Sequence, residues 1–177
     1  KGIVIGTGRA HAEMPKKLEN VNIALIDVPL EIKDTEIDAK IQISDPNQLQ
    51  SFLDKEESIL REMTERIIES GAKAVICQKG IDDMAQYFLA KKGIFALRRV
   101  KESDMRKIAK ATSGKIVSNL KELSKEDLGF AGIVEEKKVG DEKMTFITKC
   151  ENPKAVTILI RGGTEHVIDE VERAITD

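Results

Sequence analysis

Residue types that mark several protein classes are scarce in this sequence. Its 177 residues include no tryptophan, one tyrosine, two cysteines and two histidines. Two isolated cysteines do not make a disulfide framework, and neither His11 nor His166 has a second metal ligand one helical turn away. No stretch approaches the roughly 18 consecutive apolar residues of a membrane-spanning helix. The sequence therefore disfavours a disulfide-stabilised module, a metal centre and a membrane protein.

Charged residues are abundant and nearly balanced in sign. The 29 Lys and Arg residues face 31 Asp and Glu residues, a formal net charge of −2, so no basic surface for nucleic acid is expected. A charged fraction of 34% with 3% aromatic residues favours a thermophilic source. Cys77 ends an apolar run and is expected to be a core residue, and two isolated cysteines fit a reducing, cytoplasmic compartment.

The length of the chain is that of one domain with its own core. The first residues, KGIVI, form a strand-like run without an initiating methionine or the apolar segment of a signal peptide. We therefore expect a single domain, residues 1–177, excised from a longer protein.

Strand-like and helix-like segments alternate between residues 72 and 117. Three short apolar runs are typical of buried strands: Ala74–Cys77, Ile94–Leu97 and Lys115–Val117. The two segments between them have apolar stripes of helical period, formed by Ile81, Met84, Ala85, Phe88 and Leu89 in the first and by Met105, Ile108, Ala109 and Thr112 in the second. This order predicts a β-α-β-α-β unit with parallel strands and right-handed crossovers, its two helices lying side by side.

The ends of these two helices have recognisable signals. Asp82 or Asp83 is expected to cap the start of the first helix, and Ser103 and Asp104 the start of the second. Gly93 and Gly114 stand where the helices stop, a position that favours the left-handed conformation. Because the side chains of adjacent residues point to different faces of a helix, the Asp82–Asp83 pair indicates capping and not acid–base catalysis.

A much longer helix is predicted over residues 46–70. Ser44 or Asp45 would cap it and Pro46 would occupy its first turn. Its roughly 25 residues would span about 37 Å, against an average of roughly 11–12 residues. The apolar spacing breaks at residues 54–58, which leaves a kink or two separate helices open. Part of such a helix is expected to project with its apolar stripe under-buried; the alternative is an ordinary core helix lying across the sheet.

The remaining segments complete an α/β fold with a central sheet or sandwich, flanking helices and one long projecting helix. The pattern predicts strands at Gly2–Ile5, Asn22–Asp27 with a corner at Pro29, Asp38–Ile43, Phe130–Lys137, Met144–Lys149 and a central strand at Ala155–Ile160, a capped turn at Ser124, and a final helix from Thr164. Two glycine turns, Gly6–Gly8 and Arg161–Gly163, could hold a phosphate, but neither is followed by the remainder of a known phosphate-binding motif.

A resemblance to a known family is carried by three long strings. These are QKGIDDMAQYFLAKKGIFALRRVKESDMRKIAKATSGKIV, NVNIALIDVPLEIKDTEIDAKIQISDP and ENPKAVTILIRGGTEHVIDEVERA. They closely resemble the apical, substrate-binding domain of group II chaperonins, the archaeal thermosome and its eukaryotic cytosolic relatives, over nearly all of the chain. The segment GTGRAHAEMP departs from the family by lacking the usual charged residues and proline before Met14-Pro15, so the conformation of residues 6–13 is not predicted.

The resemblance implies a chaperone and not an enzyme. It implies non-native polypeptides as clients, neighbouring subunits of a double ring as partners, and a monomeric isolated domain. Residues 38–70 would form the helical protrusion that closes the ring, and residues 164–177 would lead toward the intermediate domain. ATP and Mg²⁺ would bind elsewhere in the parent chain, leaving no cofactor here, and Asp177 would be the aspartate that helps activate water for ATP hydrolysis there.

Two client-binding surfaces follow from this resemblance and from the helical patterns. The first is the outward face of the two helices of residues 82–112 and the groove between them, with Asp83, Gln86, Tyr87 and Lys91 on one helix and Arg106, Lys107 and Lys110 on the other. The second is the exposed stripe of the protrusion, formed by Leu49, Phe52, Leu53, Ile59 and Leu60. The alternative for the first surface is a solvated, inert face. Two other functions remain open: a small Rossmann-like domain that binds a phosphorylated ligand, and a helical oligomerisation module.

Overall fold

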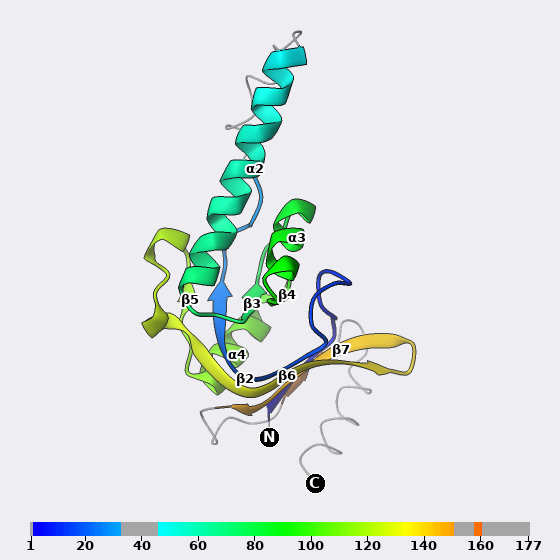
Figure 1. Ribbon diagram of the computed structural model, residues 1–177. Coiled ribbons are helices and arrows are strands. Elements are labelled where there is room, and N and C mark those ends of the chain that lie inside the picture. The colour runs from blue at the N-terminus through cyan, green and yellow to red at the C-terminus, as the bar shows by residue number, and fades with distance from the viewer. Residues whose placement is uncertain (1, 33–45, 151–157, 161–177) are drawn as a thin grey trace.

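The computed structural model of the chain describes residues 2–32, 46–150 and 158–160 (Figure 1). Its elements are, in order, β1 (Gly2–Ile5), β2 (Lys17–Ile26), α2 (Pro46–Glu69), β3 (Ala74–Cys77), α3 (Asp83–Lys91), β4 (Phe95–Leu97), α4 (Glu102–Thr112), β5 (Ile116–Val117), the 3₁₀ turns η2 (Leu120–Glu122) and η3 (Lys125–Asp127), β6 (Gly129–Val139), β7 (Glu142–Cys150) and β8 (Ile158–Ile160). The fold is mixed α/β, as predicted.

The described strands form one sheet in the order β4-β3-β2-β6-β7-β1-β8, with β5 beside the end of β2. β3, β4 and β5 run parallel to β2 or to each other, which confirms the β-α-β-α-β unit. β6 and β7 form the predicted antiparallel hairpin. The prediction of a central strand at residues 155–160 is wrong for its described part, because β8 pairs with β1 at the end of this order.

The two faces of the sheet are covered by different helices. Along β2, Ile23 and Leu25 point to one face and Ala24 and Ile26 to the other, as the two-residue period of a strand requires. The first face packs against the buried stripe of α4, and the second packs against α2 and α3.

The expectation that α3 and α4 lie side by side is therefore wrong. The crossover from β3 through α3 leads outward to β4, whereas the crossover from β4 through α4 leads back past β3 to β5 on the far side of β2. A right-handed crossover that reverses direction places its helix on the opposite face of the sheet. The neighbour of α3 is α2, which lies beside it (Figure 1).

α2 is one helix of 24 residues, without the break left open at residues 54–58. At about 1.5 Å per residue it is about 36 Å long. Its buried residues, Leu60, Thr64 and Ile67, all belong to the C-terminal half. Figure 1 shows this half beside α3 and the N-terminal half extending away from the sheet. The alternative of a helix lying wholly across the sheet is thereby excluded.

The helix ends agree with the sequence in part. The Asp82 side chain accepts a hydrogen bond from the Met84 amide at 2.9 Å, and Gly93 has a φ of 71°. α4 instead begins at Glu102 after Lys101, and the left-handed residue at its end is Ser113, not Gly114. Gly114 is needed for a different reason, since a Cβ there would lie 2.9 Å from the amide nitrogen of Gly129.

The segment that departs from the chaperonin pattern, residues 6–13, is held by contacts to distant strands. The Thr145 hydroxyl donates to the Thr7 carbonyl at 2.7 Å, and the Ala10 amide donates to the Ala96 carbonyl of β4 at 2.8 Å. The Arg9 guanidinium forms an ion pair with Glu136 of β6, and the two side chains are 9% and 6% exposed. This segment thus ties the edge strand β4 to the β6–β7 hairpin.

Candidate functional site

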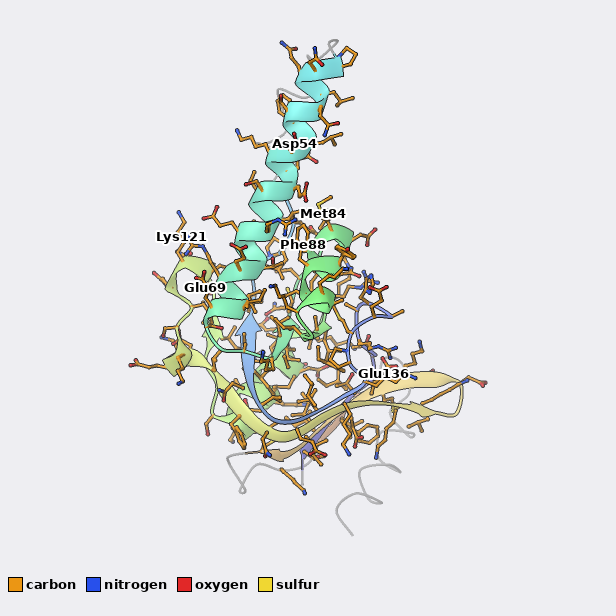
Figure 2. All side chains as sticks on the ribbon, viewed as in Figure 1. Asp54, Glu69, Met84, Phe88, Lys121 and Glu136 are labelled. Carbon is orange, nitrogen blue, oxygen red and sulfur yellow. The ribbon has the colours of Figure 1, made fainter. Side chains whose placement is uncertain are left out.

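The large apolar side chains that remain exposed in the described part of the chain lie on two neighbouring helices. Leu49 and Leu53 of α2 are each 43% exposed, and Met84 and Tyr87 of α3 are 41% and 42% exposed. Figure 2 shows Met84 on the part of α3 that faces the middle of α2, below the extended half of that helix. Exposed apolar side chains therefore lie both on the extended part of α2 and on the neighbouring helix α3.

On α2 this surface is the continuation of a core stripe. Leu60 and Ile67 lie on the same side of the helix as Leu49 and Leu53, because these positions repeat at multiples of three to four residues. Leu60 is only 2% exposed, so its predicted exposure is wrong; Ile59 and Phe52 are half-buried. The stripe leaves the core between Leu60 and Leu53, where α2 rises beyond the elements that cover it.

On α3 most of the residues that were predicted to point outward are exposed, but one is buried. Asp83, Tyr87 and Lys91 are exposed, as predicted. Gln86 is 4% exposed, and its side-chain amide donates to the Ile81 carbonyl at 2.8 Å, so its outward placement is wrong. This bond satisfies a carbonyl just before the helix start that would otherwise be buried without a partner. Met84, predicted in the buried stripe, is exposed instead.

A cleft of about 300 Å³ lies where α2 and α3 meet. Its lining consists of Arg61, Thr64, Glu65, Ile68, Tyr87, Phe88, Lys91 and Lys92. The Arg61 guanidinium lies 4.2 Å from the centroid of the Phe88 ring, a cation–π contact between the two helices. The Lys91 ammonium lies 5.2 Å from the centroid of the Tyr87 ring, and a hydrogen bond with the Tyr87 side chain raises the pKa of Lys91. The cleft thus places two aromatic rings beside two cations.

The predicted residues of α4 are not brought to this cleft. Arg106 and Lys110 are exposed and Lys107 is half-buried, but their helix covers the opposite face of the sheet. Arg106 forms an exposed ion pair with Glu102 one turn earlier, at 3.6 Å. A groove between α3 and α4 does not exist, and α4 forms a separate surface.

Asp104 of α4 is expected to make the stability of the fold depend on pH. Burial raises the pKa of its carboxyl above the ordinary value of 3.8, outweighing the opposing effects of Lys107 and Lys101. The folded state therefore binds this proton more tightly than the unfolded state, and stability is lost as pH rises from the unfolded pKa through the folded one. We expect the melting temperature of Asp104→Asn, relative to the parent, to increase between pH 3 and pH 7. An unchanged difference across this range would contradict the assignment.

The described residues give little support to a metal site, a cysteine nucleophile or a phosphate site. No group of three His, Cys, Asp or Glu residues in that part of the chain could hold a metal ion. Burial raises the pKa of the Cys77 thiol to about 12 and that of Cys150 to about 11, so neither is a ready nucleophile. Gly6–Gly8 leads to β2 and not to a helix, which removes the phosphate site expected of a Rossmann-like domain there.

Several predicted features fall outside the described residues. They are the strand Asp38–Ile43, the helix cap at Ser44 or Asp45, the turn Arg161–Gly163 with the helix from Thr164, and Asp177. In the part that is described, no helix has both the length and the apolar character needed to cross a membrane.

Comparison with known proteins assigns the chain to a family. The sequence model of the TCP-1/cpn60 chaperonin family matches residues 1–177. The chain is 59% identical over 176 residues to thermosome subunit beta of Archaeoglobus fulgidus and 60% identical over 177 residues to the thermosome subunit of Methanopyrus kandleri. These alignments cover 99% and 100% of the chain and 32% of each relative, so the chain spans about a third of their length.

The fold agrees with this assignment. An open-state monomer of a group II chaperonin from Methanococcoides burtonii matches the whole chain with a TM-score of 0.75 and 44% sequence identity, over 38% of its own length. On sequence and on structure alike, the chain belongs to the TCP-1/cpn60 chaperonin family, as a segment of archaeal thermosome type.

Proposed function

We propose that this chain is the part of a group II chaperonin that captures non-native polypeptide and helps to close the folding chamber. One observation carries the proposal: Leu49, Leu53, Met84 and Tyr87 stay exposed on two adjoining helices, in a family of chaperonins. Unfolded chains expose apolar side chains, and a surface that offers the same chemistry binds them without reading a sequence.

The affinity of one such surface is expected to be low. Full burial of a leucine-sized side chain contributes about 1.5–3 kcal/mol, but these side chains are already more than half covered, so the gain from each is smaller. Several copies held in a ring would bind one client through many weak contacts, and multivalency would raise the overall affinity without any new contact.

Polar groups are expected to supplement the apolar contacts. Asp83 and Lys91 are exposed on α3 beside Tyr87, and Arg61 faces the same cleft from α2. Charged side chains at the rim of an apolar surface steer and speed association. The surface we propose is therefore made of α2 and α3, and it leaves out α4.

The extended half of α2 would also serve as the helical protrusion that closes the ring. Its apolar stripe can be covered either by a client or by a neighbouring subunit, and closure would then release the client into the chamber. The energy would come from ATP hydrolysis in the remainder of the parent chain, where ATP and Mg²⁺ would bind. Asp177 would take part in that reaction only within the assembled subunit.

Hydrogen exchange tests the location of the client surface. The chain is compared alone and in the presence of a reduced, unfolded protein. We expect slower exchange in residues 46–60 and 83–92 when the client is present, because both helices would be covered. The backbone of α4 provides the internal control and is expected to exchange unchanged. Protection confined to α4, or absent everywhere at saturating client, would contradict the proposed surface.

A further inference from the structure

We propose that a groove on the side of α2 remote from α3 is a second client site, which takes uncharged apolar segments of a non-native polypeptide. The groove, called here the lateral groove, lies between the C-terminal half of α2, the segment after β2 and the turn η2. It is separate from the cleft that α2 forms with α3, because the two hollows share no lining residue. This inference rests on the proposed function, since it names a further surface for the same clients.

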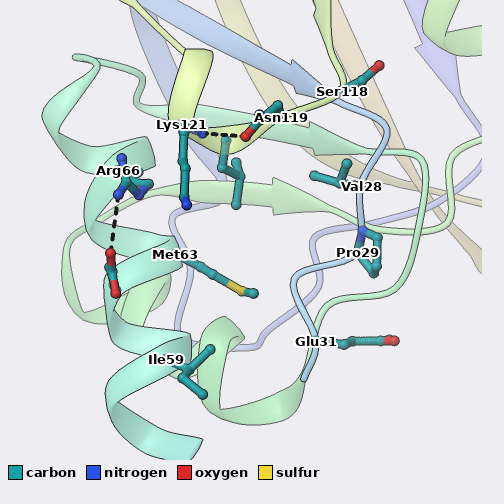
Figure 3. Close-up of a pocket in the computed structure, with 11 residues that line it drawn as sticks. Val28, Pro29, Glu31, Ile59, Met63, Arg66, Ser118, Asn119 and Lys121 are labelled. Atoms are coloured by element: carbon teal, nitrogen blue, oxygen red, sulfur yellow. Dashed lines mark hydrogen bonds and ion pairs between the residues drawn. The ribbon is translucent and has the colours of Figure 1, made fainter. Parts of the chain in front are cut away.

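The lateral groove is formed by three segments that are distant in sequence (Figure 3). Its main cavity has a volume of about 600 Å³, and a second hollow of about 230 Å³ shares Arg66 and Leu120 with it. Cavities that bind ligands have volumes of about 300–1,000 Å³. In Figure 3, the Met63 side chain points from α2 toward Val28 and Pro29 across the cavity. The groove is therefore large enough to hold several side chains of a bound segment.

The lateral groove lies at a point of the sheet where ligand sites are common. β2 and β5 are parallel neighbours, but the chain leaves β2 for α2 on one face and reaches β5 from α4 on the other. In open α/β sheets, ligands bind in the crevice beyond the carboxyl ends of strands whose connections diverge in this way. Val28 and Ser118, which line the groove, follow these two carboxyl ends.

The floor of the groove is apolar and only partly covered. Half-buried apolar side chains come to it from all three segments: Val28, Pro29, Ile59, Met63, Leu120 and Leu123. Phe52, Ile59 and Met63 lie along one side of α2, because they are seven and four residues apart. Phe52 is half-buried on the extended half of the helix. An apolar row thus runs from the part of α2 proposed to meet clients into the groove.

The charges around the groove nearly balance. Its two hollows are lined by three acids and three bases: Glu31, Glu62, Glu69, Arg66, Lys121 and Lys125. Glu62 pairs with Arg66 at 3.2 Å. Even if Arg99 is added, which approaches Glu31 at 4.0 Å, the excess is one positive charge. Such a rim gives little advantage to a charged occupant, and burying an unpaired charge on the apolar floor would be costly. The groove therefore suits an uncharged apolar segment, which folded proteins bury and unfolded clients expose.

Polar groups at the rim match the backbone of such a segment. The Ser118 hydroxyl donates to the Asp27 carboxylate at 3.0 Å, and the Asn119 side-chain carbonyl accepts from the Lys121 amide at 2.9 Å. The Ser118 hydroxyl oxygen can still accept a hydrogen bond, and the Asn119 side-chain NH₂ group can still donate one. Backbone N–H and C=O groups need partners when they are buried, and the rim offers one partner of each kind.

Photolabelling with a short peptide tests this inference. The probe is a six-residue peptide of leucine and alanine with blocked ends and one benzoylphenylalanine, about 20 Å long when extended. The chain is irradiated with the probe, and the adducts are mapped by mass spectrometry. We expect residues 118–123 to carry at least fivefold more adduct than residues 137–143 at the turn of the β6–β7 hairpin. An excess of a reduced, unfolded protein is expected to lower this labelling at least fivefold, because its segments would occupy the groove.

Two substitutions in the turn η2 locate the labelling. Leu120→Lys puts a charge into the floor and is expected to lower the adduct on residues 118–123 at least fivefold. Glu122→Lys introduces the same side chain at a neighbouring position that lines neither hollow, and it serves as the matched control. Unchanged labelling of residues 83–92 shows that a variant is folded. If Leu120→Lys does not fold, Met63→Lys introduces the charge from the α2 side of the floor.

Failure of the inference can be told apart from failure of the proposed function. If residues 118–123 are labelled no more than the hairpin turn while residues 46–57 and 83–92 are labelled, the lateral groove is excluded and the proposed function stands. Equal losses from the two lysine variants, or labelling that the unfolded protein does not reduce, would also overturn the inference. If none of these segments is labelled more than the hairpin turn, the proposed function itself is wrong.

Discussion

Replacing Leu49 and Leu53 together by aspartate is expected to lower the affinity of the chain for an unfolded polypeptide at least tenfold. Both side chains are exposed over nearly half of their surface, so covering them with a client would contribute on the order of 1–2 kcal/mol in total. A loss of about 1.4 kcal/mol corresponds to a tenfold weaker dissociation constant, and the new carboxylates would also have to lose water. Fluorescence titration with a labelled, reduced protein measures the change.

The fold is expected to survive this double substitution. The two positions lie in the half of α2 that extends away from the sheet, and exposed substitutions usually change stability by no more than about 0.5 kcal/mol. Ser51→Asp adds a carboxylate on the other side of the same helix and serves as the matched control. Undiminished binding by the double variant, with its circular dichroism intact, would refute a role for the extended half of α2 in client binding. Equal weakening by Ser51→Asp would point to charge and not to the leucines.

Periodic segments of the chain could be predicted from the sequence with good accuracy. The helical stripe beginning at Pro46, the run AVIC of β3 and the hairpin around Gly140 all form where the pattern places them. Each is a local property, because the period of a helix or strand and the residue at a turn depend on neighbours a few positions away. The helices and strands that form the candidate site could thus be predicted from the sequence.

The arrangement of these helices and strands in space could not be predicted from the sequence. The apolar stripes of α3 and α4 have the same period, and nothing within either stripe says which face of the sheet it covers. That choice depends on where β5 pairs, beside β2 and not beyond β4, which is a contact between distant segments. The same limit applies to burial: Leu60 and Leu53 belong to one apolar stripe, yet Leu60 is buried in the core and Leu53 is exposed.

Sequence patterns could not predict the Arg9–Glu136 ion pair either. Its two residues are 127 positions apart, and Arg9 sits in the segment GTGRAHAEMP, which departs from the chaperonin pattern. Glu136 accepts a hydrogen bond from the Arg9 amide at 2.8 Å in addition to pairing with the guanidinium. One carboxylate thus fixes both the backbone and the side chain of Arg9. A glycine-rich turn in the sequence does not by itself predict such a contact.

Replacing Glu136 by alanine is therefore expected to destabilise the chain severely, by about 3–5 kcal/mol. The substitution leaves a buried guanidinium with one remaining described acceptor, the Ala12 carbonyl at 3.1 Å, and also removes the acceptor of the Arg9 amide. For a domain of this size the loss corresponds to a fall in melting temperature of roughly 6–20 °C. Urea denaturation measures the free energy of unfolding, and calorimetry measures the melting temperature.

The control for this prediction is Glu19→Ala, which removes an exposed ion pair with Lys17 at 3.4 Å and is expected to cost at most about 1 kcal/mol. If Glu136→Ala were no more destabilising than Glu19→Ala, the buried pair would be irrelevant to stability. Loss of the Arg9–Glu136 pair is also expected to affect β4, because residues 6–13, which contain Arg9, donate the Ala10 hydrogen bond to Ala96. Freeing residues 6–13 would uncover this edge strand, and exposed edges pair with other chains. Faster aggregation of Glu136→Ala below its melting temperature is the expected consequence.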